Sequence, residues 1–260
     1  MRKREYLCLI PLPFLISFLI QYAVVYLFNT LQISNRVTDE TTYTMLFRVA
    51  VGCAYILIFG LWYLRCFGKT REVPLKRSLA LNHVLLLLAI AICGQVAISF
   101  LLTIILPLFK GAVEQYQAMM GSMFVITPLS VLYVAVLTPI GEECIFRGLT
   151  MKFAGKALPA LAANLIQAAL FGFYHMNLVQ GIYAFVMGFV FGYAVLRLKS
   201  LWASIIMHVI LNAVGLWMNA NLDPDLPIAS SAVICILSIA IVVISMYLLP
   251  ILKTETHEEG

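Results

Sequence analysis

The stretch LTPIGEECIFRGLTMKF, residues 137–153, places two adjacent acids and an arginine inside an apolar part of the chain. Apolar residues continue to Ile140; Glu142 and Glu143 follow, and Arg147 comes four residues after Glu143. A charged side chain at membrane depth costs about 2.5–3.5 kcal/mol on insertion scales, so it usually faces a cavity or a partner. The stretch therefore predicts a polar centre enclosed within a membrane protein.

The composition of the whole chain agrees with this interpretation. Of its 260 residues, 63% are hydrophobic and 11% are charged, and the mean hydropathy is +0.99. Because a soluble domain carries about 25% charged residues, we expect a polytopic protein embedded in the lipid bilayer. The net charge of +5 does not indicate a nucleic-acid partner, because basic residues in membrane proteins mainly set their orientation.

Apolar segments predict eight transmembrane helices in a single membrane domain that covers residues 1–260. Their expected bounds are 6–28, 45–64, 82–108, 122–153, 158–176, 180–197, 201–219 and 229–251. The fourth segment exceeds the roughly 20 residues of a simple span, so we expect a long fourth helix that forms a hairpin with the fifth. The expected fold class is an all-α membrane helix bundle. Gly188 and Gly192 form a GxxxG pattern, which predicts a close helix contact.

The basic residues predict how the chain sits in the membrane. With the N-terminus in the cytoplasm, 14 of the 17 Lys and Arg residues fall on the inner side, and the other three are Arg36, Arg48 and Lys110. Cytoplasmic loops carry an excess of Lys and Arg. We therefore expect an integral cell-membrane protein with both termini in the cytoplasm.

Six polar residues at membrane depth form the candidate site: Glu142, Glu143, Arg147, His175, His208 and Asn212. The i,i+4 spacing of Glu143 and Arg147 favours an intrahelical ion pair, and His208 shares a helix face with Asn212. Counted from a hairpin turn at residues 155–159, Glu142 and His175 reach nearly the same depth. Unless Pro139 kinks the helix, three helices bring an acid, two imidazoles and an amide to one cavity.

This set contains the groups needed to hydrolyse a peptide bond with an activated water. A glutamate in an apolar cavity is a competent general base, and a neighbouring histidine can share the water or protonate the leaving amine. A second histidine and an asparagine can donate hydrogen bonds to the developing oxyanion, each such donor typically contributing about 10²–10³ in rate. No serine or cysteine is clearly paired with a base.

Three motifs follow one another on successive predicted helices: EECIFR reads as EExxxR, FGFYH as FxxxH and HVILN as HxxxN. Together they resemble the CAAX protease and bacteriocin-processing family, also called the Abi family, which includes the type II CAAX prenyl endopeptidases. The resemblance covers about residues 120–220, the expected catalytic core. It implies a glutamate-dependent intramembrane endopeptidase that cleaves a membrane-associated or lipidated peptide, in bacteriocin self-immunity or peptide maturation, from a site open toward the cytoplasm.

The resemblance also implies a role for each residue of the candidate site. By motif position, Glu142 is the water-activating base and His175 its partner. His208 and Asn212 form the oxyanion hole, while Glu143 and Arg147 orient the site. The implied mechanism uses no metal and no cofactor.

Three alternatives stay open at this point. Two histidines and a glutamate are ligand types of a catalytic zinc site, so a metal-dependent protease with zinc at Glu142, His175 and His208 is one. A non-catalytic immunity or scaffold protein that binds a peptide in the same cavity is another. An ion-coupled transporter also places acids and histidines at mid-depth, but the sequence shows no inverted repeat or pair of broken helices.

Overall fold

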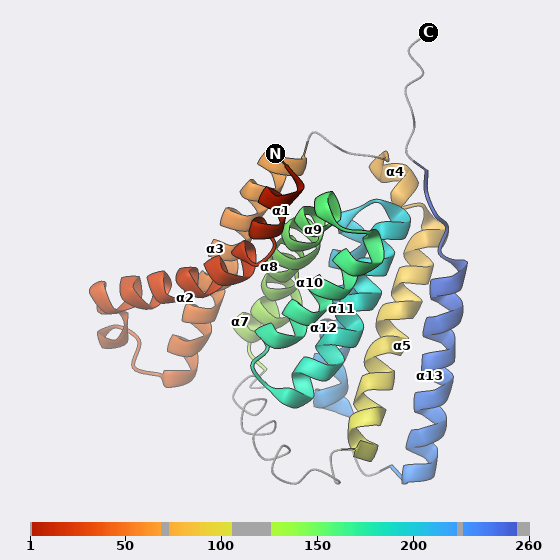
Figure 1. Ribbon diagram of the computed structural model, residues 1–260. Coiled ribbons are helices and arrows are strands. Elements are labelled where there is room, and N and C mark those ends of the chain that lie inside the picture. Colours follow the sequence, from red (N-terminus) through yellow and green to blue (C-terminus); the bar gives the residue numbers. More distant parts are fainter. Residues whose placement is uncertain (1, 69–72, 106–125, 223–225, 254–260) are drawn as a thin grey trace.

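The computed structural model describes residues 2–68, 73–105, 126–222 and 226–253, whose regular elements are all helical (Figure 1). The predicted all-α fold class is confirmed. Among the described residues, seven helical stretches are long and apolar enough to cross a membrane, and an eighth apolar helix is shorter. In chain order the elements are α1 (Lys3–Leu9), α2 (Leu12–Thr30), the 3₁₀ turn η1 (Ile33–Asn35), α3 (Glu40–Phe67), α4 (Leu75–Ser78), α5 (Leu81–Ile105), α7 (Pro128–Val131), the π-helical segment η3 (Leu132–Leu137), α8 (Thr138–Glu143), the π-helical segment η4 (Cys144–Thr150), α9 (Met151–Ala157), α10 (Ala160–Tyr174), α11 (Leu178–Leu198), α12 (Leu201–Asn221) and α13 (Ile228–Leu248).

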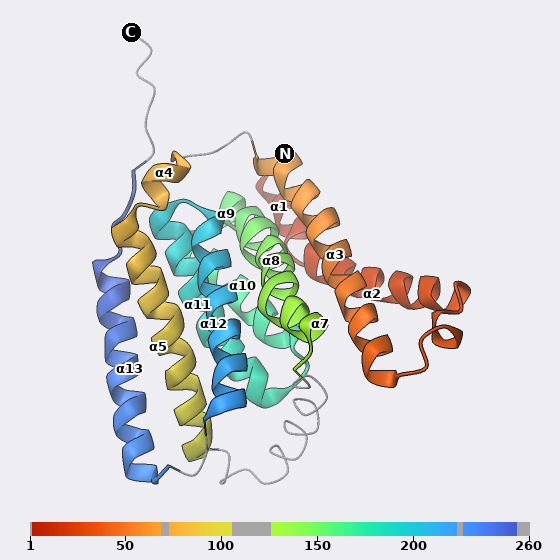
Figure 2. The same cartoon turned by 180° about the vertical axis from the view of Figure 1, so that it is seen from behind.

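The first predicted span, 6–28, lies within Lys3–Thr30, which is long and apolar enough to cross a membrane, but a break divides this stretch into two helices. The chain ends α1 at Leu9 and starts α2 at Leu12, because Pro11 has no backbone N–H to continue the helical ladder. Figures 1 and 2 show α2 running across the direction of the other long helices. Residues 106–108 and 122–125 of two further predicted spans lie outside the described residues, as does Lys110.

The segments α7, η3, α8, η4 and α9 follow one another without a break and form one long helix, Pro128–Ala157. Two of its turns are wide: the N–H of Thr138 bonds the carbonyl of Tyr133, five residues back, and Met151 bonds Phe146 in the same way. A proline inside a regular helix clashes with the carbonyl four residues before it. The wide turn just before Pro139 relieves that clash, so the helix continues.

The long helix and α10 form the predicted hairpin, with a turn at residues 158–159. However, the predicted fifth span, 158–176, is longer than the helix that forms. At 15 residues, α10 is about 22 Å long, which is less than the roughly 30 Å of a bilayer core. It ends at Tyr174 with His175 as its C-cap, and Met176, with φ of 50°, turns the chain back into α11.

The predicted close contact at the GxxxG pattern is confirmed, since α10 and α11 pack face to face. A Cβ atom on Gly188 would lie 3.0 Å from Cδ1 of Phe171, and one on Gly192 would collide with the side chain of Asn164. Asn164 and Gln167 also link the two helices. Their side-chain amides donate to the carbonyls of Phe189 (3.0 Å) and Gly188 (2.9 Å).

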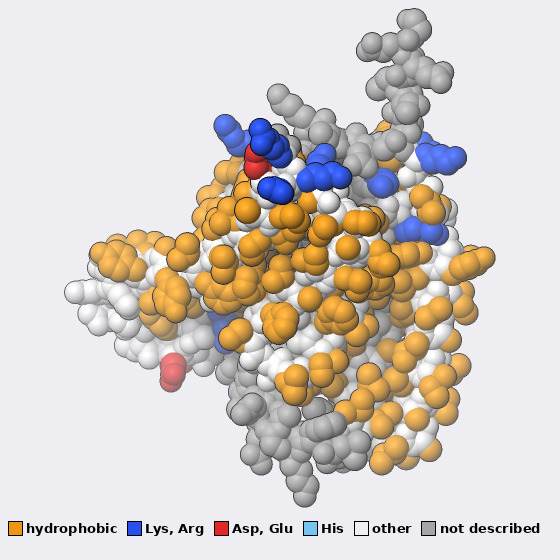
Figure 3. Space-filling model, in the orientation of Figure 1, with side chains coloured by type: hydrophobic (Ala, Val, Ile, Leu, Met, Phe, Trp, Pro, Cys, Tyr) orange, Lys and Arg blue, Asp and Glu red, His pale blue; other side chains and the backbone are white. Residues whose placement is uncertain are grey.

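The remaining helices surround the long helix on several sides. It contacts α3, α10 and α12, while α5 packs between α12 and α13 (Figure 2). Hydrophobic side chains cover the flank of the molecule in Figure 3, and Lys and Arg gather at the end where the N-terminus lies. Arg65, Lys156 and Arg197 are in the last turns of α3, α9 and α11. This distribution is that of a membrane protein with an apolar belt and one basic end.

Candidate active site

The centre of the site is a buried ion pair on the long helix. Nη1 of Arg147 donates to Oε1 of Glu143 over 2.8 Å, and both side chains are fully shielded from solvent. The guanidinium also lies over two aromatic rings, 4.3 Å from the centroid of Phe171 and 5.2 Å from that of Phe191. The ion pair expected from the i,i+4 spacing is therefore present, and two rings on α10 and α11 fix its position.

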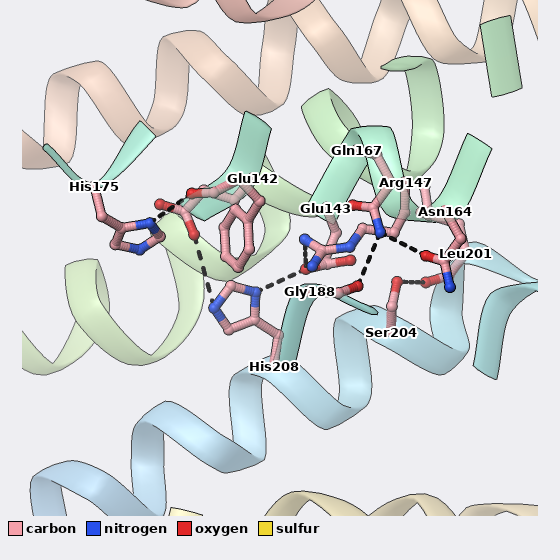
Figure 4. Close-up of polar contacts among 11 residues, drawn as sticks. Glu142, Glu143, Arg147, Asn164, Gln167, His175, Gly188, Leu201, Ser204 and His208 are labelled. Atoms are coloured by element: carbon pink, nitrogen blue, oxygen red, sulfur yellow. Dashed lines mark hydrogen bonds and ion pairs between the residues drawn. The ribbon is translucent and has the colours of Figure 1, made fainter. Parts of the chain in front are cut away.

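His208 connects this pair to Glu142 (Figure 4). Its Nδ1 lies 2.8 Å from Oε1 of Glu143, and because a carboxylate only accepts hydrogen bonds, Nδ1 carries the proton. Its Nε2 faces Oε2 of Glu142 at 3.7 Å, which is too long for a hydrogen bond. Glu142 is only 5% exposed, so a buried carboxyl and a ring nitrogen face each other, both with bonding capacity left for water or substrate.

His175 is anchored in the same manner at the end of α10. Its Nδ1 donates to the carbonyl of Phe171 over 2.8 Å, which leaves Nε2 for other partners. The imidazoles of His175 and His208 both contact the Phe171 ring edge-on, with centroid separations of 4.8 and 5.8 Å. Figure 4 shows both imidazoles on the side of the Glu142 carboxyl. The structure thus brings three of the four predicted catalytic side chains together.

Asn212 occupies a different place. It lies one turn along α12 from His208, and its Nδ2 donates to the carbonyl of Val134 in η3 over 2.9 Å. This bond uses one of its two amide hydrogens and leaves the other. Asn212 therefore ties α12 to the wide turn of the long helix, and among the described residues it makes no hydrogen bond to Glu142 or His175.

Sequence reasoning missed a group of tyrosines beside the acid. The hydroxyl of Tyr55 donates to the carbonyl of Ser17 (3.0 Å) and accepts from Gln21 (2.7 Å) and from Tyr174 (3.2 Å). Tyr55 and Tyr174 both interact electrostatically with Glu142. The hydroxyl of a buried tyrosine needs a hydrogen-bond partner. Tyrosines within apolar segments could therefore have been predicted to join a buried polar site.

A cavity of about 160 Å³ opens next to these tyrosines. Its polar lining comes from α2, α3, the long helix and α10, and consists of Gln21, Arg48, Tyr55, Tyr133, Thr138 and Tyr174. Thr138 lies four residues before Glu142, on the same helix face. The cavity therefore approaches the buried acid from one side.

The zinc alternative can be compared with the same geometry. Across residues 2–68, 73–105, 126–222 and 226–253, no three His, Cys, Asp or Glu side chains are grouped closely enough to hold a metal ion. Glu142, His175 and His208 thus do not fit a zinc site in this arrangement.

The fold and the site define a helical membrane protein with a buried centre of two acids, two imidazoles and a guanidinium. Residues 124–214 match the family described as "Type II CAAX prenyl endopeptidase Rce1-like". The predicted resemblance to the type II CAAX prenyl endopeptidases is confirmed for this segment, about a third of the chain, which contains every residue of the candidate site.

One curated relative points to the same class. A stretch of 85 residues is 31% identical to the "Putative membrane peptidase YdiL" of Bacillus subtilis (strain 168). It covers 33% of this chain and 35% of that protein, so the match spans about a third of the relative's length. No solved structure matches the chain.

Proposed function

We propose that this protein is an intramembrane glutamate-dependent endopeptidase that uses an activated water to cleave a membrane-associated or lipidated peptide or protein. The observation that carries the proposal is the buried carboxyl of Glu142, which faces Nε2 of His208 at 3.7 Å. Nδ1 of His208 and Nδ1 of His175 are both held by acceptors. The match to a family of prenyl endopeptidases supports the same reaction class.

In the proposed mechanism, Glu142 takes a proton from a water whose oxygen attacks the scissile carbonyl carbon. The carbonyl oxygen becomes an oxyanion that accepts hydrogen bonds from protonated Nε2 of His208 and from the remaining amide hydrogen of Asn212. The carboxylate of Glu143 stabilises the imidazolium, and Arg147 holds Glu143 in place. When the C–N bond breaks, the amine takes the proton from Glu142, with His175 as the nearby ring that shares it.

The orientation in the membrane forms part of the proposal. The basic end in Figure 3 is taken to face the cytoplasm, since Lys and Arg accumulate on that side. Both termini then lie in the cytoplasm of a protein in the cell membrane, and the substrate enters from that side. Fusing to each terminus a reporter that is active only outside the cell tests this orientation. Reporter activity from either fusion would contradict it.

The central test replaces Glu142 in the purified, folded protein. In proteoliposomes given a library of lipidated peptides, Glu142→Gln should lower the cleavage rate by about 10²–10⁴-fold, the usual contribution of a general base. Glu40→Gln, at an exposed acid in the first turn of α3, is the matched control and should cleave normally. Undiminished cleavage by Glu142→Gln would remove the proposal.

The biological role is tested in the same variants. We propose a part in bacteriocin self-immunity or peptide maturation, for which cells carrying Glu142→Gln should lose protection or accumulate an uncleaved peptide. If these cells keep full protection, the protein acts by binding a peptide and not by cutting it.

A further inference from the structure

The cavity beside Glu142 contains a cation that the proposed reaction does not use. Arg48 lies in α3, eight residues from the start of the helix, and lines the cavity. Its Nη1 is buried and has no hydrogen-bond partner among the residues that the structure describes. A charged side chain within a membrane helix is costly unless it faces a cavity or a partner. Arg48 faces a cavity, so a ligand that occupies this cavity would be the partner of its guanidinium.

The helix contacts place Arg48 relative to the candidate active site. Because a Cβ atom on Gly52 would meet Leu137 and one on Gly141 would meet Tyr55, α3 and the long helix run side by side in the same direction. Arg48 is then level with Tyr133, and both side chains line the cavity.

Tyr133 precedes Glu142 by nine residues, about 13 Å along the helix axis. An extended peptide advances about 3.3–3.6 Å per residue. A peptide that is held at Arg48 and at Glu142 therefore extends over about three or four residues. It can be shorter where the arginine side chain reaches toward Glu142.

We infer that Arg48 binds a carboxylate of the peptide substrate while the scissile bond lies at Glu142. This inference rests on the proposed endopeptidase function and adds the substrate feature that the enzyme selects. A guanidinium pairs with a carboxylate through two parallel hydrogen bonds, and the neighbouring tyrosine and glutamine side chains supply further polar contacts.

The lining of the cavity decides what can occupy it. The cavity has a volume of about 160 Å³, and its polar side chains suit a carboxylate-bearing residue better than an apolar lipid chain. The carboxylate has two possible sources, the C-terminus of the peptide and an Asp or Glu side chain within four residues of the cleaved bond.

Two pairs of lipidated peptides distinguish these sources. One pair differs only in a C-terminal acid or amide, and the other places Asp or Asn at each position within four residues of the scissile bond. Against the favoured acid, Arg48→Gln should lower kcat/KM by about 10–100-fold, the range of a charge-assisted hydrogen bond, and should leave the neutral peptide unchanged. Arg48→Lys should restore part of the rate, and the exposed Arg36→Gln should match the wild type.

The outcomes separate this inference from the proposed function. If Glu142→Gln is inactive but Arg48→Gln slows acid and neutral peptides equally, the carboxylate site is refuted and the endopeptidase stands. If Glu142→Gln cleaves normally, the endopeptidase itself is wrong.

Binding supplies a second readout that needs no cleavage. Fluorescence anisotropy of dansylated peptides should show that the Glu142→Gln variant binds the acid peptide more tightly than the neutral one. Adding Arg48→Gln should abolish this preference, and adding Arg48→Lys should reduce it. Equal binding of acid and neutral peptides before the second substitution refutes the site. The thermal midpoint of each variant shows that it is folded.

Discussion

Replacing Arg147 by methionine tests how much the buried Glu143–Arg147 pair contributes to the free energy of unfolding, separately from its effect on cleavage. Arg147 and Glu143 are both completely buried and joined at 2.8 Å. Removing one partner of a buried pair typically costs about 3–5 kcal/mol, because the other charge is left without compensation. Glu143 would keep only its bond to His208.

The local contacts shift this range in opposite directions. Nε and Nη2 of Arg147 are buried and have no hydrogen-bond partner among the described residues, so methionine also removes two unsatisfied donors. In the other direction, the contact with the Phe171 ring is worth about 2 kcal/mol when desolvated. These effects nearly offset each other, so Arg147→Met should cost about 3–5 kcal/mol of unfolding free energy. The double variant Glu143→Leu with Arg147→Met should recover at least about 2 kcal/mol, because apolar replacement of a whole buried pair is often neutral.

Thermal unfolding in detergent measures these differences. For a domain of 150–250 residues each kcal/mol shifts Tm by about 2–4 °C, so the single variant should melt about 6–20 °C lower and the double variant closer to the wild type. Arg65→Met, at an exposed position, should stay within about 0.5 kcal/mol. The double variant should nevertheless lose cleavage, because Nδ1 of His208 has lost its acceptor. A double variant no more stable than the single one would refute the reasoning.

Three further outcomes are expected. Gly192→Ala should cost about 1–3 kcal/mol in the same melting assay, because the new Cβ collides with Asn164. Gly60→Ala is the control and should not destabilise the protein, because the space around Gly60 is open. Equal losses of stability in the two variants would contradict the tight α10–α11 contact. Asn212→Leu should lower kcat by about 10²–10³-fold if the amide stabilises the oxyanion, and an unchanged kcat would remove it from the chemistry. Exhaustive chelation should leave cleavage intact, and a loss that zinc restores would establish the metal-dependent alternative.

Local spacing was a sound guide wherever one helix decides the geometry. The pair of Glu143 and Arg147 follows from the rise and pitch of a single helix, and so does the shared face of His208 and Asn212. The hairpin followed from a segment too long for one span. In each case the contact depends on residues close in sequence, whose relative positions the helix fixes before any packing takes place.

Contacts between helices could not be read in the same way. Periodicity gave no warning that Pro139 would be accommodated by a wide turn, or that α10 would end at Tyr174 inside the expected span. The sequence predicted that Arg48 lies on the outer side of the membrane, but it gave no sign that Arg48 lines a cavity with Tyr133 of another helix. Such placements depend on the tilt and rotation of whole helices, which packing determines.

The regular segment α8, with a wide turn on each side, presents two adjacent acids to different partners. In a regular helix Glu142 and Glu143 diverge by about 100°, and each would need its own surroundings. Here α8 lies between η3 and η4, and π turns occur frequently at functional sites. Glu143 turns toward Arg147 and His208, which both bond its Oε1, while Glu142 lies near Tyr55 and Tyr174. In the proposed mechanism the paired acid positions the imidazole and the other acid activates the water, so a single short segment carries both carboxylates in separate surroundings.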